Sequence, residues 1–270
     1  MSKEDLKTEG LTQHDKDLER IAEFTLFDDI FMNAVFRDNI PGVQYILDVI
    51  LGVPKLRIES VQIQRPLINL RGHSICLDIY AVDDNNKRYD IEVQAENEGA
   101  SLRRVRYYTS LIDADILERR SKYKNLVDTY VIFITGNDIY GKGLPIYHLD
   151  KYIRETGEYQ DDGSYILFVN GSYNGDDDIG KLMHDFKCKE PSELLTPVIA
   201  ERITYLKTDE KGREFMCKMM EDMRNEVELE LKRSIARNLI EMGTLSIEDI
   251  AKATDLSVDE VKLIAENKSA

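Results

Sequence analysis

The stretch YDIEVQ at residues 89–94 follows CLDIYAV at residues 76–82, and a polar turn, DDNNK, separates the two. Both stretches alternate apolar and polar residues with a period of two, which is the pattern of β-strands, so together they predict an antiparallel hairpin. If Asn85 lies at the centre of the turn, residue i pairs with residue 170 − i, and Asp78 lies opposite Glu92.

The period-two pattern divides this hairpin into two faces. One face is apolar and carries Leu77, Ile79, Ala81, Tyr89, Ile91 and Val93, and the other is polar and carries Cys76, Asp78, Tyr80, Asp90, Glu92 and Gln94. Two interpretations follow for the polar face. Either it is open to solvent, as in an ordinary half-exposed hairpin, or a helix covers it and two carboxylates share a divalent cation. The cation would relieve the repulsion between like charges that face each other across the two strands.

The rest of the chain predicts an α/β protein with a helical C-terminal part. Before the hairpin, residues 15–51 have helical spacing and end at Gly52, and after it a polar linker leads to another helix. Residues 136–200 are rich in loop residues, and the run Asp176–Asp178 is predicted to be a solvated loop. The predicted strands are 56–69, 75–82, 89–95, 129–135 and 165–172, and the later predicted helices are 101–118, the charged segment 208–242 and two short tail helices with capping boxes Ser246…Asp249 and Ser257…Glu260.

Composition and charge narrow the classes of function. The formal net charge of −15 over 270 residues means that binding to DNA requires a local basic patch, and residues 101–124 supply seven Lys and Arg against three Asp and Glu. Cys76, Cys188 and Cys217 lie far apart without a CxxC spacing, which is typical of reduced thiols in a cytoplasmic protein. The sequence has no apolar run near 18 residues and no signal-peptide pattern at its start, so we expect neither a membrane span nor secretion.

Asp78, then Glu92-Val93-Gln94 on the next strand, then a helix with Arg104 and Tyr108, resembles the PD-(D/E)XK nuclease superfamily. The closest resemblance is to the PD-(D/E)XK nuclease family transposases, or recombination-promoting nucleases (Rpn). It extends from DDIFMNAVF (28–36) through blocks between residues 106 and 186, and spans about residues 24–265. The resemblance implies a restriction-endonuclease-like α/β core with a mixed sheet flanked by helices, and a helical C-terminal region. The domain limits that we predict are 1–19 for a charged N-terminal segment, 20–190 for the nuclease-like domain and 191–270 for the helical region with its tail.

The resemblance also assigns roles at the polar face. Asp78 and Glu92 would be metal ligands, and the Val93 carbonyl would be a third. The superfamily often places an additional acid on the first helix, for which Asp29 is the candidate and neighbouring Asp28 the alternative.

Gln94 stands where the superfamily usually has a catalytic Lys. Because glutamine carries no charge and cannot act as a base, it can only position water by hydrogen bonds.

The helix in 101–124 is the candidate DNA surface. Arg103, Arg104, Tyr108 and Lys122 are the predicted DNA-binding or phosphate-binding residues. The tail has the spacing of a helix-turn-helix, but residues 246–266 hold six acids against two lysines. A packing role or a protein-interaction role is therefore favoured for the tail over reading of DNA.

These observations lead to a first hypothesis of a divalent-metal-dependent DNA endonuclease that uses Mg²⁺, with Mn²⁺ or Ca²⁺ as alternatives, in recombination or mobile-element biology. The second hypothesis is a catalytically weak or inactive nuclease-like protein that acts as a protein-interaction or DNA-binding module. A homo-oligomer and a protein partner for the tail stay open under both hypotheses. A third, an acidic regulatory protein without nucleic-acid contact, applies if residues 101–124 form no basic face.

Overall fold

The computed structural model describes residues 11–53 and 55–266. Contacts within the chain divide it into two compact units, one that runs to Met216 and one that starts at Cys217. The division falls inside a long helix. The sequence-based limits of 1–19, 20–190 and 191–270 remain a proposal about domains.

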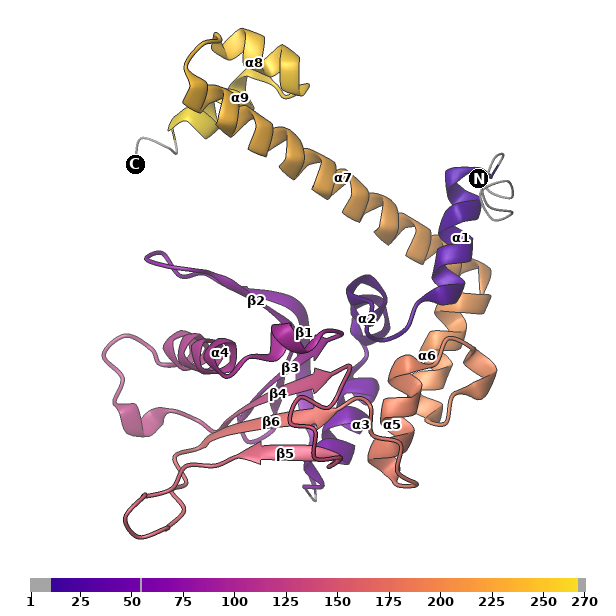
Figure 1. Ribbon diagram of the computed structural model, residues 1–270, viewed down its shortest axis with the longest axis vertical. Helices are drawn as coiled ribbons and strands as arrows, with labels where there is room; N and C mark the ends of the chain where they lie inside the picture. Colours follow the sequence, from indigo (N-terminus) through magenta and orange to yellow (C-terminus); the bar gives the residue numbers. More distant parts are fainter. Residues whose placement is uncertain (1–10, 54, 267–270) are drawn as a thin grey trace. The chain divides into compact units, whose positions relative to one another are not determined.

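Within the described residues the chain forms nine α-helices and six β-strands (Figure 1). The helices are α1 (Gln13–Glu23), α2 (Asp29–Phe36), α3 (Ile40–Leu51), α4 (Leu102–Ile116), α5 (Asp178–Lys187), α6 (Pro197–Thr208), α7 (Glu210–Met242), α8 (Ile247–Thr254) and α9 (Val258–Glu266). The strands are β1 (Ile58–Leu67), β2 (Ile75–Asp83), β3 (Arg88–Gln94), β4 (Thr129–Thr135), β5 (Ile146–Leu149) and β6 (Ser164–Asn170).

The strands form one mixed sheet in the order β1-β2-β3-β4-β6-β5. The neighbours β3, β4 and β6 run parallel, whereas β1, β2 and β5 each pair antiparallel with their neighbours. A parallel pair needs a crossover connection, and α4 lies in the crossover from β3 to β4. Because this crossover begins where β3 ends, the start of α4 lies near the end of β3.

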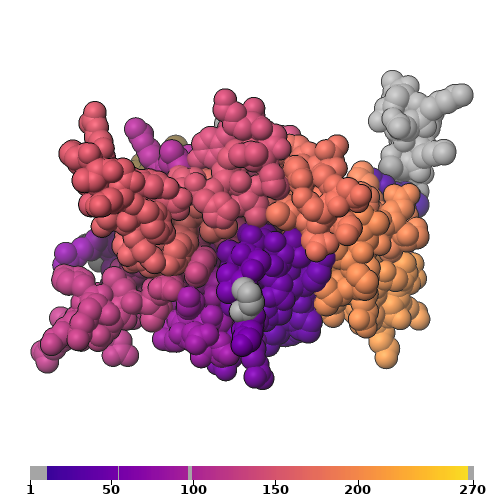
Figure 2. All heavy atoms as spheres, turned by 90° about the horizontal axis from the view of Figure 1, so that it is seen from below, coloured from indigo at the N-terminus to yellow at the C-terminus, as the bar shows by residue number. Residues whose placement is uncertain are grey.

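Both faces of the sheet are covered by helices. On one face, Val105, Tyr108 and Ile112 of α4 pack on Tyr80 of β2 and Phe133 of β4 in a continuous apolar core. On the other side, α3 contacts β1 and also packs against α5 and α6 (Figure 1). Seen from below in Figure 2, the indigo atoms of the N-terminal helices adjoin the orange atoms of the α6 region. A mixed sheet with helices on both faces and a helical C-terminal region confirms the predicted architecture.

The structure corrects two sequence predictions in residues 136–200. A short strand, β5, was not predicted, because its four residues follow the Gly- and Pro-rich stretch GKGLP and give too short a pattern. The acidic run Asp176–Asp178 is not a loop throughout. Asp177 caps α5 by accepting a hydrogen bond from the backbone N–H of Gly180 (2.8 Å), and Asp178 is the first helical residue.

The second unit has its own small core, in which Ala236, Ile250, Ala251, Leu256 and Val261 are buried among neighbouring aliphatic residues of α7, α8 and α9. The capping box of Ser257 and Glu260 is confirmed, because the backbone N–H of Ser257 also donates to Glu260 Oε2 (3.0 Å), whereas Ser246 makes only the hydroxyl half of its predicted box. The Ser246 hydroxyl accepts from the backbone N–H of Asp249 (3.1 Å), and the Ser257 hydroxyl accepts from that of Glu260 (3.2 Å). Within residues 11–53 and 55–266, no helix is both long enough and apolar enough to cross a membrane.

Candidate active site

The predicted hairpin register is confirmed. Tyr80 pairs with Asp90 and Ile79 with Ile91 across β2 and β3, so the residue numbers of each pair add to 170 as expected from a turn centred on Asn85. Continuing this register places Asp78 opposite Glu92. Their contact agrees with it, because the backbone N–H of Asp78 donates to Glu92 Oε1 (3.0 Å).

The central part of the hairpin's polar face is buried, whereas Cys76 at its edge is exposed. The Glu92 side chain has no exposed surface, and Asp90 is equally enclosed beneath α4. The interpretation of a half-exposed hairpin is therefore wrong, and the predicted covering of this face by a helix is confirmed, while the shared cation stays a prediction.

Asp78 is held by two donors from different strands. Its Oδ2 accepts from the backbone N–H of Val93 on β3 (3.0 Å), and its Oδ1 accepts from Nε2 of Gln64 on β1 (3.2 Å). Gln64 on β1 lies opposite Asp78 on β2, and its backbone is in the left-handed region, with φ of 53°. The same Nε2 donates to Asn33 Oδ1 on α2 (3.2 Å). Gln64 thus connects the carboxylate to the first helices, a role that sequence reasoning missed because it depends on the register between β1 and β2.

Glu92 forms an ion pair with Arg104 of α4. The distance from Arg104 Nη2 to Glu92 Oε2 is 3.1 Å, and about a third of the arginine side chain is exposed while the carboxylate has no exposed surface. The guanidinium also donates to the Gln94 side-chain oxygen (3.2 Å), the Gly99 carbonyl (3.1 Å) and the Tyr108 hydroxyl (2.9 Å). A single arginine therefore connects Glu92 and Gln94 of the motif to the helix above them.

Burial makes both carboxylates reluctant to ionise. Desolvation raises the pKa of Asp78 to about 6, and the charge of Asp29 adds to this effect. The pKa of Glu92 is raised to about 8, mainly by desolvation and secondly by the charge of Asp78, although Arg104 acts in the opposite direction. Strongly perturbed carboxyl pKa values in one cluster are typical of functional sites and indicate a place where bound positive charge is favoured.

The structure distinguishes the two acids that were considered on the first helix. Asp28 Oδ2 accepts from the backbone N–H of Thr25 (2.8 Å) and from its hydroxyl (3.1 Å), so Asp28 holds a turn. Asp29, in the first turn of α2, is exposed, and its pKa is raised by desolvation and by Asp28 and lowered by Arg104. Asn33 follows it by one helical turn and reaches Gln64, which places this side of α2 beside Asp78. Asp29 is thus the better placed of the two as an additional acid.

Of the four predicted DNA-binding residues, the structure brings only some to the site. Arg103 is exposed near the start of α4. Arg104 pairs with Glu92, and the hydroxyl of the buried Tyr108 accepts a hydrogen bond from Arg104. Lys122 lies beyond the end of α4, and the helix from Arg104 to that end is about 18 Å long at about 1.5 Å per residue. The structure therefore does not bring Lys122 together with the other three.

Asp90 is an acid of the hairpin for which the sequence suggested no role. Among the described residues, both of its carboxylate oxygens are buried without a hydrogen-bond partner. Burial and the charge of Glu92 raise its pKa well above the ordinary value for aspartate. An unpaired buried carboxyl is costly in its charged form, so Asp90 is expected to be neutral in the folded protein.

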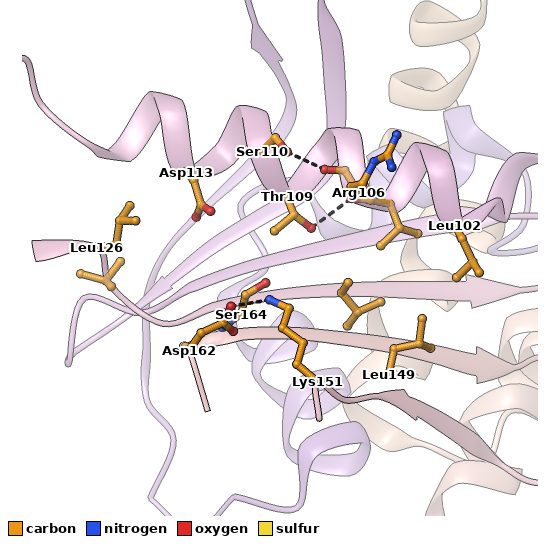
Figure 3. A pocket seen from close by; sticks show the side chains of 14 residues that line it. Leu102, Arg106, Thr109, Ser110, Asp113, Leu126, Leu149, Lys151, Asp162 and Ser164 are labelled. Atoms are coloured by element: carbon orange, nitrogen blue, oxygen red, sulfur yellow. Dashed lines mark hydrogen bonds and ion pairs between the residues drawn. The ribbon is translucent and has the colours of Figure 1, made fainter. Parts of the chain in front are cut away.

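A cavity of about 630 Å³ lies elsewhere under α4, next to β5 and β6 (Figure 3). Apolar side chains such as Leu102 and Leu149 line it, together with Lys151 and Asp162, which form an ion pair (2.5 Å). Neither Asp78 nor Glu92 lines this cavity, so the acidic cluster is a separate site.

The donor set of the cluster fits a hard divalent cation. Carboxylate oxygens are the protein ligands that Mg²⁺ prefers, and Mg²⁺ is often held by only one or two of them together with substrate phosphates and water. No set of three or more His, Cys, Asp or Glu side chains in the described part of the chain is arranged to hold a metal. Arg104 now supplies positive charge beside Glu92, where a cation would also bind.

Residues 38–159 match the family model of the PD-(D/E)XK nuclease family transposases. The matched segment is somewhat less than half of the chain and contains the acidic cluster with α4, whereas Asp29 and the second unit lie outside it. No curated protein and no solved structure matches the chain. Together with the mixed sheet, the match confirms the resemblance inferred from the sequence and the restriction-endonuclease-like α/β fold, and it supports a nuclease-like function. Nucleases of this type generally use divalent metal ions and act on DNA.

Proposed function

We propose that this protein is a divalent-metal-dependent DNA endonuclease that hydrolyses phosphodiester bonds, with a cytoplasmic role in recombination or mobile-element biology. The observation that carries the proposal is the pairing of Asp78 with Glu92, which are desolvated, directly opposed and in contact through a 3.0 Å hydrogen bond. Mg²⁺ is the proposed ion, and Mn²⁺ and Ca²⁺ are the alternatives to be compared.

In this proposal Asp78 and Glu92 hold the cation, the Val93 carbonyl is a third ligand, and Asp29 supplies further negative charge. A divalent ion bound there would lower the pKa of a water molecule and stabilise the negative charge that develops on the phosphoryl oxygens. The bond from phosphorus to the attacking water oxygen forms while one bond from phosphorus to a bridging oxygen breaks, the water releases a proton to solvent, and the leaving oxygen takes up a proton from solvent.

Gln94 and Arg104 act on the reacting groups without taking up a proton. Gln94 orients the water by a hydrogen bond, because an amide can donate and accept but cannot serve as a base at neutral pH. Arg104 Nη1 lies 3.2 Å from the Gln94 oxygen and fixes the direction of the amide, so that its NH₂ group points away from the guanidinium. Arg104 also brings positive charge to a motif that lacks the usual lysine.

The experiment that tests the proposal is cleavage of supercoiled plasmid with Mg²⁺, Mn²⁺ or Ca²⁺. Asp78→Asn and Glu92→Gln are the test variants. Asp84→Asn is the matched control, since Asp84 is an exposed acid in the turn of the same hairpin. We expect wild type and Asp84→Asn to cut and the two test variants to lose at least about a hundredfold in rate, the scale of a lost electrostatic contact in an active site. Cleavage that persists in both test variants would overturn the site assignment.

A second candidate function is a catalytically weak nuclease-like module that binds DNA or protein. The observation in its favour is that protein donors already occupy both carboxylates, with Gln64 and Val93 on Asp78 and Arg104 on Glu92. Binding of a cation would have to displace Arg104 or Gln64. A folded protein that binds DNA but cuts with none of the three metals would favour this second function.

A further inference from the structure

The turn between β1 and β2 (residues 68–74), which we call the hairpin tip, is a different turn from the one between β2 and β3. It carries two large apolar side chains that are exposed to solvent. Leu70 is 93% exposed and Ile68 is 69% exposed. In Figure 1 the violet hairpin of β1 and β2 projects beyond the other strands of the sheet. The projecting position and the apolar side chains suggest a contact with a partner.

The charge around the hairpin tip indicates the chemistry of that partner. Residues 60–77 contain no Asp or Glu, and neither do residues 99–112, although acids outnumber bases by 51 to 36 in the whole chain. The first segment includes Arg71 and also Arg65, which pairs with Asp115 (2.7 Å), and the second includes three arginines near the start of α4, of which Arg104 pairs with Glu92. Two acid-free segments in so acidic a protein are complementary to a polyanion.

The two segments are fastened together in space. The Tyr107 hydroxyl of α4 accepts from Asn69 Nδ2 (2.9 Å) and donates to the His73 carbonyl (2.5 Å). Arg103 lies one helical turn before Tyr107 and therefore on the same side of α4. Arg71 and Arg103 are exposed, and neither forms an ion pair with another described residue. Their charges are thus available to phosphates.

The distance from the hairpin tip to the acidic cluster matches a few base pairs. Asp78 follows His73 by five residues, the last four of them in β2, a length of at most about 17 Å at about 3.4 Å per residue. The same length covers about five base pairs of duplex DNA at about 3.4 Å per pair. A duplex whose scissile phosphate lies at Asp78 and Glu92 and that runs along β2 therefore passes the hairpin tip.

We infer that the hairpin tip is an arm that contacts the minor groove of double-stranded DNA about five base pairs from the bond that is cut. Leu70 and Ile68 make the apolar contact in the groove, as apolar wedges of minor-groove-binding proteins do, and Arg71 contacts a phosphate. This inference rests on the proposed function, because it takes DNA as the substrate of the same site.

The test is fluorescence anisotropy of a labelled 30-base-pair duplex (about three helical turns) with Ca²⁺ present, comparing Leu70→Ser, Ile68→Ser and Arg71→Gln with wild type. Leu144→Ser and Arg154→Gln are matched controls, since both residues are exposed and lie outside the hairpin tip, with Leu144 52% exposed. We expect the apolar variants to bind about ten- to a hundredfold more weakly, as for loss of one buried leucine. Only Arg71→Gln should reduce the slope of log K against log salt, by about 0.9.

The outcomes separate this inference from the function on which it rests. If wild type binds and cuts DNA while Leu70→Ser and Arg71→Gln bind as tightly as their controls, the arm is refuted and the nuclease proposal stands. If wild type does not bind duplex DNA at all, both are refuted. If the apolar variants bind DNA normally but change the sedimentation coefficient of the protein, the hairpin tip contacts a second copy of the chain instead.

Discussion

Replacing Glu92 by Gln should change how the stability of the metal-free protein depends on pH. The folded state holds the Glu92 pKa at about 8, compared with an ordinary value of 4.5. A carboxyl whose pKa is raised by folding retains a proton that the unfolded chain releases. The contribution of Glu92 to stability is therefore largest below about pH 4 and falls as pH rises from there to about pH 8.

The size of the fall follows from the shift. A change from 4.5 to about 8 spans about 3.5 pH units, which at about 1.36 kcal/mol per unit is about 5 kcal/mol. Because Asp78 and Glu92 repel each other, protonation of one makes ionisation of the other easier, so their contributions do not add. We therefore expect Glu92 itself to account for about half of this value, about 2–3 kcal/mol of lost stability between pH 5 and pH 8.5.

The assay is urea unfolding in EDTA at both pH values, with tyrosine fluorescence as the signal, since all 14 tyrosines lie in the first unit and the chain has no tryptophan. The wild-type free energy of unfolding should fall between pH 5 and pH 8.5 by about 2–3 kcal/mol more than that of Glu92→Gln. Asp84→Asn should behave as wild type. Addition of Mg²⁺ at pH 8.5 at about a hundred times its dissociation constant should return about 2.7 kcal/mol to wild type and little to Glu92→Gln. Equal pH dependence in wild type and Glu92→Gln would refute the reasoning.

Three other changes have defined outcomes. Asp90→Asn should lower the free energy of unfolding at pH 8 by less than about 1 kcal/mol, or raise it, because it removes an unpaired buried acid. Chemical denaturation with Asp84→Asn as control measures this change, and a larger loss of stability would contradict the prediction. Lys207→Met should destabilise the protein by about 3 kcal/mol, since the buried Lys207 Nζ donates to three backbone carbonyls, those of Ala22, Phe24 and Lys189 at 2.6–2.8 Å; a thermal melt that does not move would contradict this. Arg104→Gln should lower the cleavage rate at least about tenfold while Arg154→Gln does not, and equal rates would show that Arg104 only supports the helix.

The hairpin of β2 and β3 was predictable because apolar and polar residues alternate with a period of two through both strands. Alternation in residues 76–94 fixed both the faces and the register, which the pairing of Tyr80 with Asp90 confirms. The buried strand β4 was predicted with its observed bounds, since seven consecutive apolar or β-branched residues leave little alternative. By contrast, α5 was missed although Asp177 and the apolar spacing after it form a helix start that capping rules describe.

The contacts that complete the site could not be predicted from the sequence. The ion pair of Arg104 with Glu92 depends on how α4 packs on the sheet, and local patterns do not specify that packing. The hydrogen bond of Gln64 to Asp78 depends on the register of a third strand and on a left-handed residue that is not glycine. Sequence patterns thus located the carboxylates, whereas their partners are a consequence of tertiary structure.

The central claim is that Asp78 and Glu92 share one divalent cation. The direct measurement is anomalous diffraction from crystals soaked in Mn²⁺, compared between wild type and Glu92→Gln. We predict a peak in wild type at about 2.1 Å from one oxygen of each carboxylate, with Arg104 moved off Glu92, and no peak in the variant. A wild-type crystal at saturating Mn²⁺ without a peak between these residues, and with Arg104 still on Glu92, would contradict the claim.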